Sequence, residues 1–220
     1  MEKKMWCVPN INDEYIKRME DVLDLYALPY NENEPVIGVD EKTIQLLDHL
    51  HASIPMNRKH CERVDYQYKR NGTVNIFVGV EPKGGRRFLM VMAKKARVDF
   101  LAYLYEFHLQ YLDAKRIHIV LDNLSSHFEK GIREAEWLYP FLKRFEFHYT
   151  PVHASWLNVA ELEIGVIERQ CLKDMRFSSM EFLEDEVNTW QDERNEKGIK
   201  INWRFTKEKA RKTFKIDQGP

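Results

Sequence analysis

The stretch IHIVLDNLSSH, residues 117–127, decides the fold. Its first part, Ile117–Leu121, is a short apolar run rich in β-branched residues, which is typical of a strand buried on both faces of a sheet. Asp122 follows directly, at the point where the chain should leave the sheet. Open α/β sheets commonly place their ligand sites at the carboxyl edge of such strands. The sequence therefore predicts a parallel core strand that ends in a functional carboxylate.

The composition limits the class of protein. The chain has 220 residues, of which 44% are hydrophobic, enough to form one large domain with appendages. A net charge of −1, from 34 basic and 35 acidic residues, neither requires nor excludes a nucleic-acid partner. Cys7, Cys61 and Cys171 are scattered, which favours a reducing compartment over a disulfide framework. No apolar run reaches the roughly 18 residues of a membrane span, so we expect a cytoplasmic protein with no membrane partner.

Periodicity and turn residues predict the elements on both sides of the central strand. Upstream, we expect a helix over 13–28 capped by Asn12, a strand over 36–47 with Asp40 at its polar turn, a hairpin at Asn71–Gly72, a strand over 86–93 and a helix over 98–112. Downstream, we expect a short helix around 134–145, a strand over 146–150, and helices over 155–174, 178–196 (capped by Ser178 or Ser179) and 206–214.

This order predicts an α/β fold with a ribonuclease-H-like mixed sheet flanked by helices. We expect residues 1–34 to form an N-terminal arm or linker and a helix. Residues 35–175 should form the ribonuclease-H-like catalytic core, and residues 176–220 should supply C-terminal helices that pack on it.

Three acids are candidates for one site: Asp40, Asp122 and Glu161. In a ribonuclease-H-like sheet the first and fourth strands are neighbours, and the last helix of the core crosses their ends. Carboxylates that converge there would repel one another, and divalent cations would offset that cost. Mg²⁺, or Mn²⁺, with two ions per site, suits oxygen ligands and phosphoryl displacement. On helix geometry alone, Glu163 lies on another face and Glu168 lies near the face of Glu161.

Several motifs strengthen this hypothesis. VIGVDEKT (36–43), LDNLSSH (121–127) and TPVHASWLNVAE (150–161) resemble, in order, the catalytic half of bacterial insertion-sequence 630 transposases, which are relatives of the mariner-like DDE transposases. The resemblance implies a Mg²⁺-dependent DDE domain that cuts and rejoins DNA, with Asp40, Asp122 and Glu161 as its catalytic and metal-binding triad. It also assigns supporting positions near the metals to Asn123, His127, Ser155 and Asn158. Asn158 could instead only cap the last helix, and His127 could be a capping or packing histidine.

The resemblance implies double-stranded DNA, as transposon ends and target, for a partner. It also implies a homodimer when full length, and a nucleoid-associated location in a bacterial cytoplasm. Members of this family carry paired helix-turn-helix modules ahead of the domain, and we expect this chain to lack them. Phosphate contacts from basic groups such as Arg86–Arg87 should then dominate DNA binding. Two alternatives stay open: a ribonuclease-H-like nuclease without strand transfer, and an inactive remnant that only dimerises or binds DNA.

Overall fold

The structure is a computed structural model that describes residues 11–51, 54–61, 63, 66–122 and 129–216. Its helices and strands, in chain order, are α1 (Asp13–Ala27), β1 (Val36–His49), β2 (Tyr68–Glu81), β3 (Arg86–Met92), α2 (Arg97–Gln110), β4 (Ile117–Leu121), α3 (Glu129–Arg133), η2 (Pro140–Arg144), β5 (Phe145–Tyr149), η3 (Ser155–Leu157), α4 (Val159–Ile167), η4 (Glu168–Leu172), α5 (Met180–Glu196) and α6 (Lys207–Thr213). Within these ranges, no helix is both long and apolar enough to span a bilayer.

The five strands form one mixed sheet in the order β3-β2-β1-β4-β5. β1, β2 and β3 are an antiparallel meander. β4 and β5 lie parallel to β1 and to each other. β1 therefore joins an antiparallel half of the sheet to a parallel half, which is the mixed sheet that the sequence predicts.

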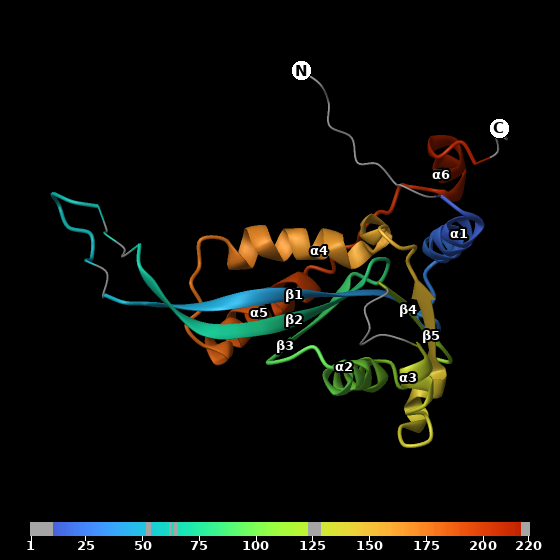
Figure 1. Cartoon of the computed structure of the whole chain (residues 1–220), viewed down its shortest axis with the longest axis horizontal. Helices are drawn as coiled ribbons and strands as arrows, with labels where there is room; N and C mark the ends of the chain where they lie inside the picture. The colour runs from blue at the N-terminus through green and yellow to red at the C-terminus, as the bar shows by residue number, and fades with distance from the viewer. Residues whose placement is uncertain (1–10, 52–53, 62, 64–65, 123–128, 217–220) are drawn as a thin grey trace.

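Helices cover both faces of this sheet (Figure 1). α2 and α3 pack on one face, in a core built around the aromatic side chains of Phe77, Phe100 and Phe107. α1, α4 and α5 pack on the opposite face in separate apolar clusters. The strand Ile117–Leu121 is buried along its whole length, because its alternate residues enter the cores of both faces. This confirms the prediction of a strand buried on both sides.

The predicted hairpin at Asn71–Gly72 is wrong, because both residues lie inside the continuous strand β2. The register of β1 and β2 shifts here: Gln45 pairs with Thr73, but Leu47 pairs with Arg70. Asn71 and Gly72 together therefore oppose a single residue of β1, which is a β-bulge. Gly72 has a φ of 102°, a conformation that only glycine adopts at low cost. The Asn-Gly pair thus marks a backbone irregularity, as its chemistry predicts, but not a chain reversal.

Three other expectations need correction. Asp40 is not at a turn: β1 continues through it to His49, and Asp40 pairs with Val78 of β2. The helix predicted over 134–145 does not form. α3 ends before this range, at Arg133, and the 3-10 turn η2 begins within it at Pro140, a residue that cannot continue a helix. The predicted helix over 155–174 is divided into η3, α4 and the π-helical turn η4.

β1 and β2 extend well beyond the rest of the sheet. Their pairing runs from Gly38 to His49 of β1, whereas β1 pairs with β4 over only Val36–Gly38. The far end of this two-stranded ribbon projects from the body of the molecule (Figure 1). Asp40 therefore lies close to the point where β1 leaves β4.

Candidate active site

The sheet places Asp40 and Asp122 at the same level on neighbouring strands. Gly38 of β1 pairs with Val120 of β4, so two residues further along each strand lead to Asp40 and Asp122. Because side chains alternate between the faces of a strand, Asp40 is on the same face as Gly38. That face is the one covered by α4, since a side chain added at Gly38 would meet Val159.

The start of α4 lies directly on β1 at Gly38. A Cβ atom at this position would be 2.4 Å from Cγ1 of Val159, 3.0 Å from Oδ1 of Asn158 and 3.2 Å from the backbone nitrogen of Ala160. Glycine is therefore required for this close approach of helix and strand. The glycine in the strand motif VIGVD is the sequence signal for this contact.

Asn158 fixes the first turn of α4 to the strand. Its Oδ1 accepts a hydrogen bond from the backbone N–H of Ala160 at 3.1 Å, as an N-cap residue does. Its Nδ2 donates to the backbone oxygen of Val39 at 2.7 Å, and the side chain is fully buried. Tyr26 of α1 accepts a hydrogen bond from the N–H of Val159 at 3.1 Å. Asn158 therefore acts as the cap that sequence reasoning allowed, and it ties the helix to the residue before Asp40.

The three acids Glu161, Glu163 and Glu168, on α4 and η4, differ in the residues that they contact. Glu163 is buried, and both of its carboxylate oxygens accept hydrogen bonds from the guanidinium of Arg87, at 3.0 and 3.1 Å. Glu168 forms an ion pair with Lys42 of β1. Glu161 lies in the first turn of α4, is exposed, and lies along the helix between the contacts of β1 with Val159 and Glu168. Of these three acids, Glu161 is the one whose charge acts on Asp40.

Electrostatics support this convergence. The half-buried position of Asp40 raises the pKa of its carboxyl group, and the negative charges of Glu161 and Asp122 raise it further, to about 7. The backbone N–H of Glu41 donates a hydrogen bond to Asp40 at 2.8 Å, which opposes this shift. Like charges in one site raise pKa values in this way. Glu161 and Asp122 therefore both act on Asp40 although the three acids are far apart in the sequence.

The supporting residues have different outcomes. Asn158 has the positioning contacts described above, whereas Ser155 is exposed at the start of η3, where its backbone oxygen accepts a hydrogen bond from Asn158 N–H at 2.7 Å. Asn123 and His127 lie outside the described residues. Arg87, a candidate for phosphate binding, is instead buried beside Glu163 and unavailable to DNA.

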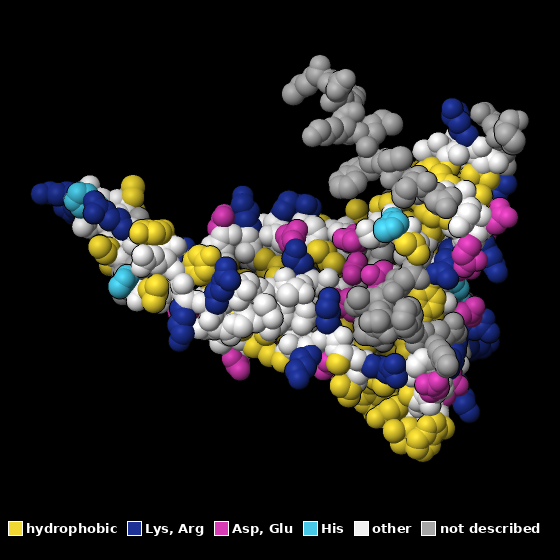
Figure 2. Space-filling model, viewed as in Figure 1, with side chains coloured by type: hydrophobic (Ala, Val, Ile, Leu, Met, Phe, Trp, Pro, Cys, Tyr) yellow, Lys and Arg dark blue, Asp and Glu magenta, His cyan; other side chains and the backbone are white. Residues whose placement is uncertain are grey.

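The donor set fits a hard divalent cation. It consists of carboxylate oxygens, the ligands that Mg²⁺ and Mn²⁺ prefer. Asp and Glu side chains gather on the surface at the end of α4 nearest β4 (Figure 2). Mutual repulsion between Asp40, Asp122 and Glu161 would be relieved by a bound cation, which gives such a site its affinity. The arrangement can therefore bind metal and phosphate oxygens at the edge of the sheet.

The fold and these acids define a ribonuclease-H-like domain with a carboxylate cluster at the carboxyl edge of its central strands. The family model described as "DDE superfamily endonuclease" matches residues 35–184, more than half of the chain. The chain belongs to this family. The family model thereby confirms the DDE class that the sequence motifs predict. No curated protein matches the chain.

Solved structures of the Mos1 mariner transposase share the fold. Its isolated catalytic domain is 15% identical with a TM-score of 0.56, and the match covers 96% of this chain and 98% of that one. The paired-end complex with Mn gives 15% identity and a TM-score of 0.56 over 90% of this chain, and the strand transfer complex gives 15% and 0.57 over all of it. This chain spans 62% of the transposase in the paired-end complex and 66% of that in the strand transfer complex. These matches confirm the ribonuclease-H-like fold.

Proposed function

We propose that this chain is the catalytic domain of a DNA transposase. It would hydrolyse a phosphodiester at a transposon end and then join the freed 3′-hydroxyl to target DNA. The single observation that carries this proposal is the convergence of Asp40, Asp122 and Glu161 from two adjacent strands and one helix, expressed in the raised pKa of Asp40. Membership of the DDE endonuclease family supports the reaction class.

Each carboxylate would have a defined part. Asp40 and Asp122, at the same level on β1 and β4, would hold Mg²⁺ or Mn²⁺, two ions per site, and Glu161 would close the set from α4. When bound, the ions would activate the attacking oxygen and stabilise the leaving oxygen of an in-line displacement. Asn158 and Gly38 would act as positioning residues, because they fix the distance between α4 and β1.

The proposed partner is double-stranded DNA, bound at the transposon ends and at the target. Two of the solved Mos1 structures are a paired end complex and a strand transfer complex, and this supports the same substrate class here. We also propose that the full-length protein is a homodimer that acts on nucleoid DNA in the cytoplasm. Exposed apolar side chains at the end of the β1–β2 ribbon, such as Leu50, Met56 and Tyr66, suit a contact with a second subunit.

A strand-transfer assay tests this function. The chain is incubated with a labelled duplex that carries the terminal sequence of its own element, with target plasmid and with Mg²⁺ or Mn²⁺. We expect cleavage at the end and a joined product, both lost in Asp122→Asn. Cleavage without any joined product would contradict the transposase and identify a nuclease. Binding without metal-dependent cleavage would instead identify an inactive remnant.

A control separates loss of chemistry from loss of fold. Glu184 is an exposed acid of α5, so Glu184→Gln removes one charge of the same kind away from the cluster. We expect this variant to cleave like the unchanged protein. Asp122→Asn should unfold at a temperature no lower than that of Glu184→Gln. If Asp122→Asn loses both cleavage and its fold, Glu161→Gln becomes the decisive variant, because Glu161 is exposed.

A further inference from the structure

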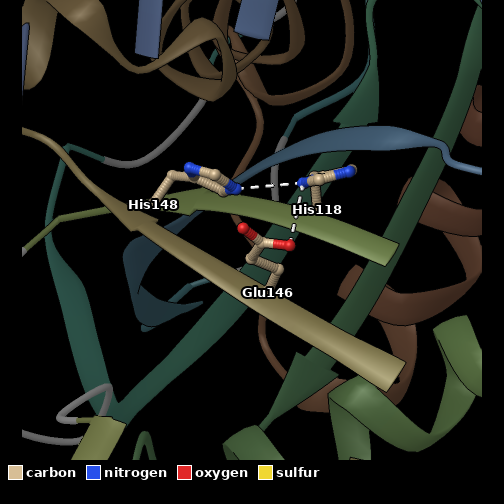
Figure 3. Close-up of side chains that lie close together, drawn as sticks. All are labelled: His118, Glu146 and His148. Carbon is tan, nitrogen blue, oxygen red and sulfur yellow. Dashed lines mark hydrogen bonds and ion pairs between the residues drawn. The ribbon is translucent and has the colours of Figure 1, made fainter. Parts of the chain in front are cut away.

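Two histidines and a glutamate meet at the opposite end of β4 from Asp122. His118 is the second residue of β4, and Glu146 and His148 are on the neighbouring strand β5, where Glu146 pairs with His118. One ligand atom from each of the three residues lies within 4.8 Å of the others. Figure 3 shows the three side chains turned toward a common point. His118 precedes Asp122 by four positions, about 13 Å along a strand, so this cluster is distinct from the carboxylate site.

We propose that His118, Glu146 and His148 form a binding site for Zn²⁺. Nδ1 of His118 and Nε2 of His148 are 3.0 Å apart. Two nitrogens bound to one tetrahedral zinc ion, each at about 2.0–2.1 Å, lie roughly 3.3–3.4 Å from each other. Oε2 of Glu146 is 3.9 Å from Nδ1 of His118. All three atoms lie within 4.8 Å of one another, so small movements of the side chains would bring them to coordination distance.

The surroundings of His148 prepare its ring for a metal. Its Nδ1–H donates a hydrogen bond to Oδ2 of Asp21, on α1, at 2.7 Å. Because a carboxylate only accepts, the neutral ring of His148 has its proton on Nδ1, and its Nε2 faces His118. A carboxylate that holds the outer nitrogen of a histidine is a common partner of protein zinc ligands, because it fixes the tautomer and raises the basicity of the ring.

In the metal-free protein, a proton occupies the place of the ion. Nε2 of His148 accepts a hydrogen bond from Nδ1–H of His118, which satisfies both rings. Zinc would take the place of this proton, which would move from Nδ1 to Nε2 of the same His118 ring. The register of β4 and β5 does not have to change, and both histidine side chains are already buried.

Charge and access at the site suit a cation. Oε2 of Glu146 pairs with the guanidinium of Arg116 at 2.9 Å, and the carboxylate of Asp21 lies near the amine of Lys17. The side chains of Glu146 and Arg116 are 43% and 55% exposed, so Arg116 can move aside and an ion can reach the histidines from solvent. Imidazole nitrogen with one carboxylate favours Zn²⁺ over Mg²⁺ or Ca²⁺, which prefer oxygen. The ion would tie α1, through Asp21, to the parallel half of the sheet.

Zinc titration of the full chain tests this site. The protein is stripped with a chelator and titrated with Zn²⁺ in excess Mg²⁺, which occupies oxygen sites but competes poorly for imidazole. Co²⁺, used in parallel, reports tetrahedral coordination through its visible absorption. We expect one equivalent of Zn²⁺, a tetrahedral Co²⁺ spectrum and a higher melting temperature. No saturable binding under these conditions would overturn the proposal.

Variants locate the ion. His148→Ala should abolish binding, and Glu146→Gln should weaken it more than Asp21→Asn does. Asp21→Asn removes only the outer partner and should weaken binding about 10- to 100-fold. Glu146 and Asp21 are about half exposed, so these two variants should keep the fold even if His148→Ala does not. His60→Gln, at an exposed histidine of the ribbon, is the matched control. Equal affinity in Glu146→Gln, Asp21→Asn and the control would show that zinc binds elsewhere.

Discussion

Gly38→Ala should inactivate the enzyme without altering any carboxylate. The added methyl group would meet Cγ1 of Val159 at 2.4 Å and the backbone nitrogen of Ala160 at 3.2 Å. The side chain of Val159 is buried. The first turn of α4 therefore has to move to make room for the added methyl group. Glu161 is in that turn and would move with it.

Two losses are expected, one of stability and one of cleavage rate. Overpacking of this kind costs about 1–3 kcal/mol of stability. For a chain of this length, each kcal/mol lowers the melting temperature by roughly 2–4 °C. A displacement of a catalytic group by about 1 Å can lower a rate on the order of 100-fold. We therefore expect cleavage to fall about 100-fold in a protein that remains folded at the assay temperature.

Gly79→Ala is the matched control. Gly79 is on β2, next to Val39 of β1, and a Cβ there would be 2.6 Å from the hydroxyl of Tyr103 and 2.8 Å from Cζ of Phe107. These atoms belong to α2, on the other face of the sheet. Both variants should lose similar stability in thermal unfolding, but only Gly38→Ala should lose DNA cleavage and Mn²⁺ affinity. Full cleavage by a destabilised Gly38→Ala, or equal losses in the two variants, would refute the role of this contact.

Three further outcomes are expected. Asn158→Ala should cost about 1–3 kcal/mol in urea unfolding, because it removes a helix cap and leaves the buried oxygen of Val39 without this donor; a cost below that of an exposed substitution would contradict it. Glu163→Ala should cost about 3–5 kcal/mol, because it leaves the buried guanidinium of Arg87 without its partner; Glu184→Ala is the control in the same unfolding assay. Asp40→Asn should raise the melting temperature in metal-free buffer above pH 7 and have no effect near pH 4. The folded pKa of Asp40 is about 7 and the unfolded value is about 4, so stability falls as pH rises between these values and the substitution removes that loss. A pH-independent effect would show that charge is not its cause.

The sequence predicted the site best where a strand delivers the side chain. Asp122 follows a fully buried strand that is apolar except for His118, and that pattern alone placed it at the edge of the sheet. The position of Asp40 within β1 was mistaken, because alternating polar residues beyond it suit both a turn and a strand exposed on one face. The pairing of Gly38 with Val120, which sets Asp40 level with Asp122, is a long-range register that no local pattern encodes.

The roles of the other acids and of the two histidines depend on contacts with residues that are distant in the sequence. Helix geometry put Glu163 on another face but left Glu161 and Glu168 near the same face, and the ion pair of Glu168 with the amine of Lys42 separates their roles. Similarly, His118 and His148 are 30 residues apart, and parallel pairing of β4 with β5 brings them together. Side chains that meet through strand pairing between distant segments are those that a single sequence does not reveal.

The position of β1 in the sheet has a consequence for synthesis of the protein. β1 pairs with β2 along most of its length, and this meander is complete once residue 92 has been made. Asp122 and Glu161 follow later in the chain, and β4 joins β1 through only Val36–Gly38. A nascent chain can therefore form stable β-structure while it holds just one of the three proposed metal ligands. Under this arrangement, DNA-cutting activity appears only when the parallel half and α4 have joined the meander, so incomplete chains would leave the DNA of the cell intact.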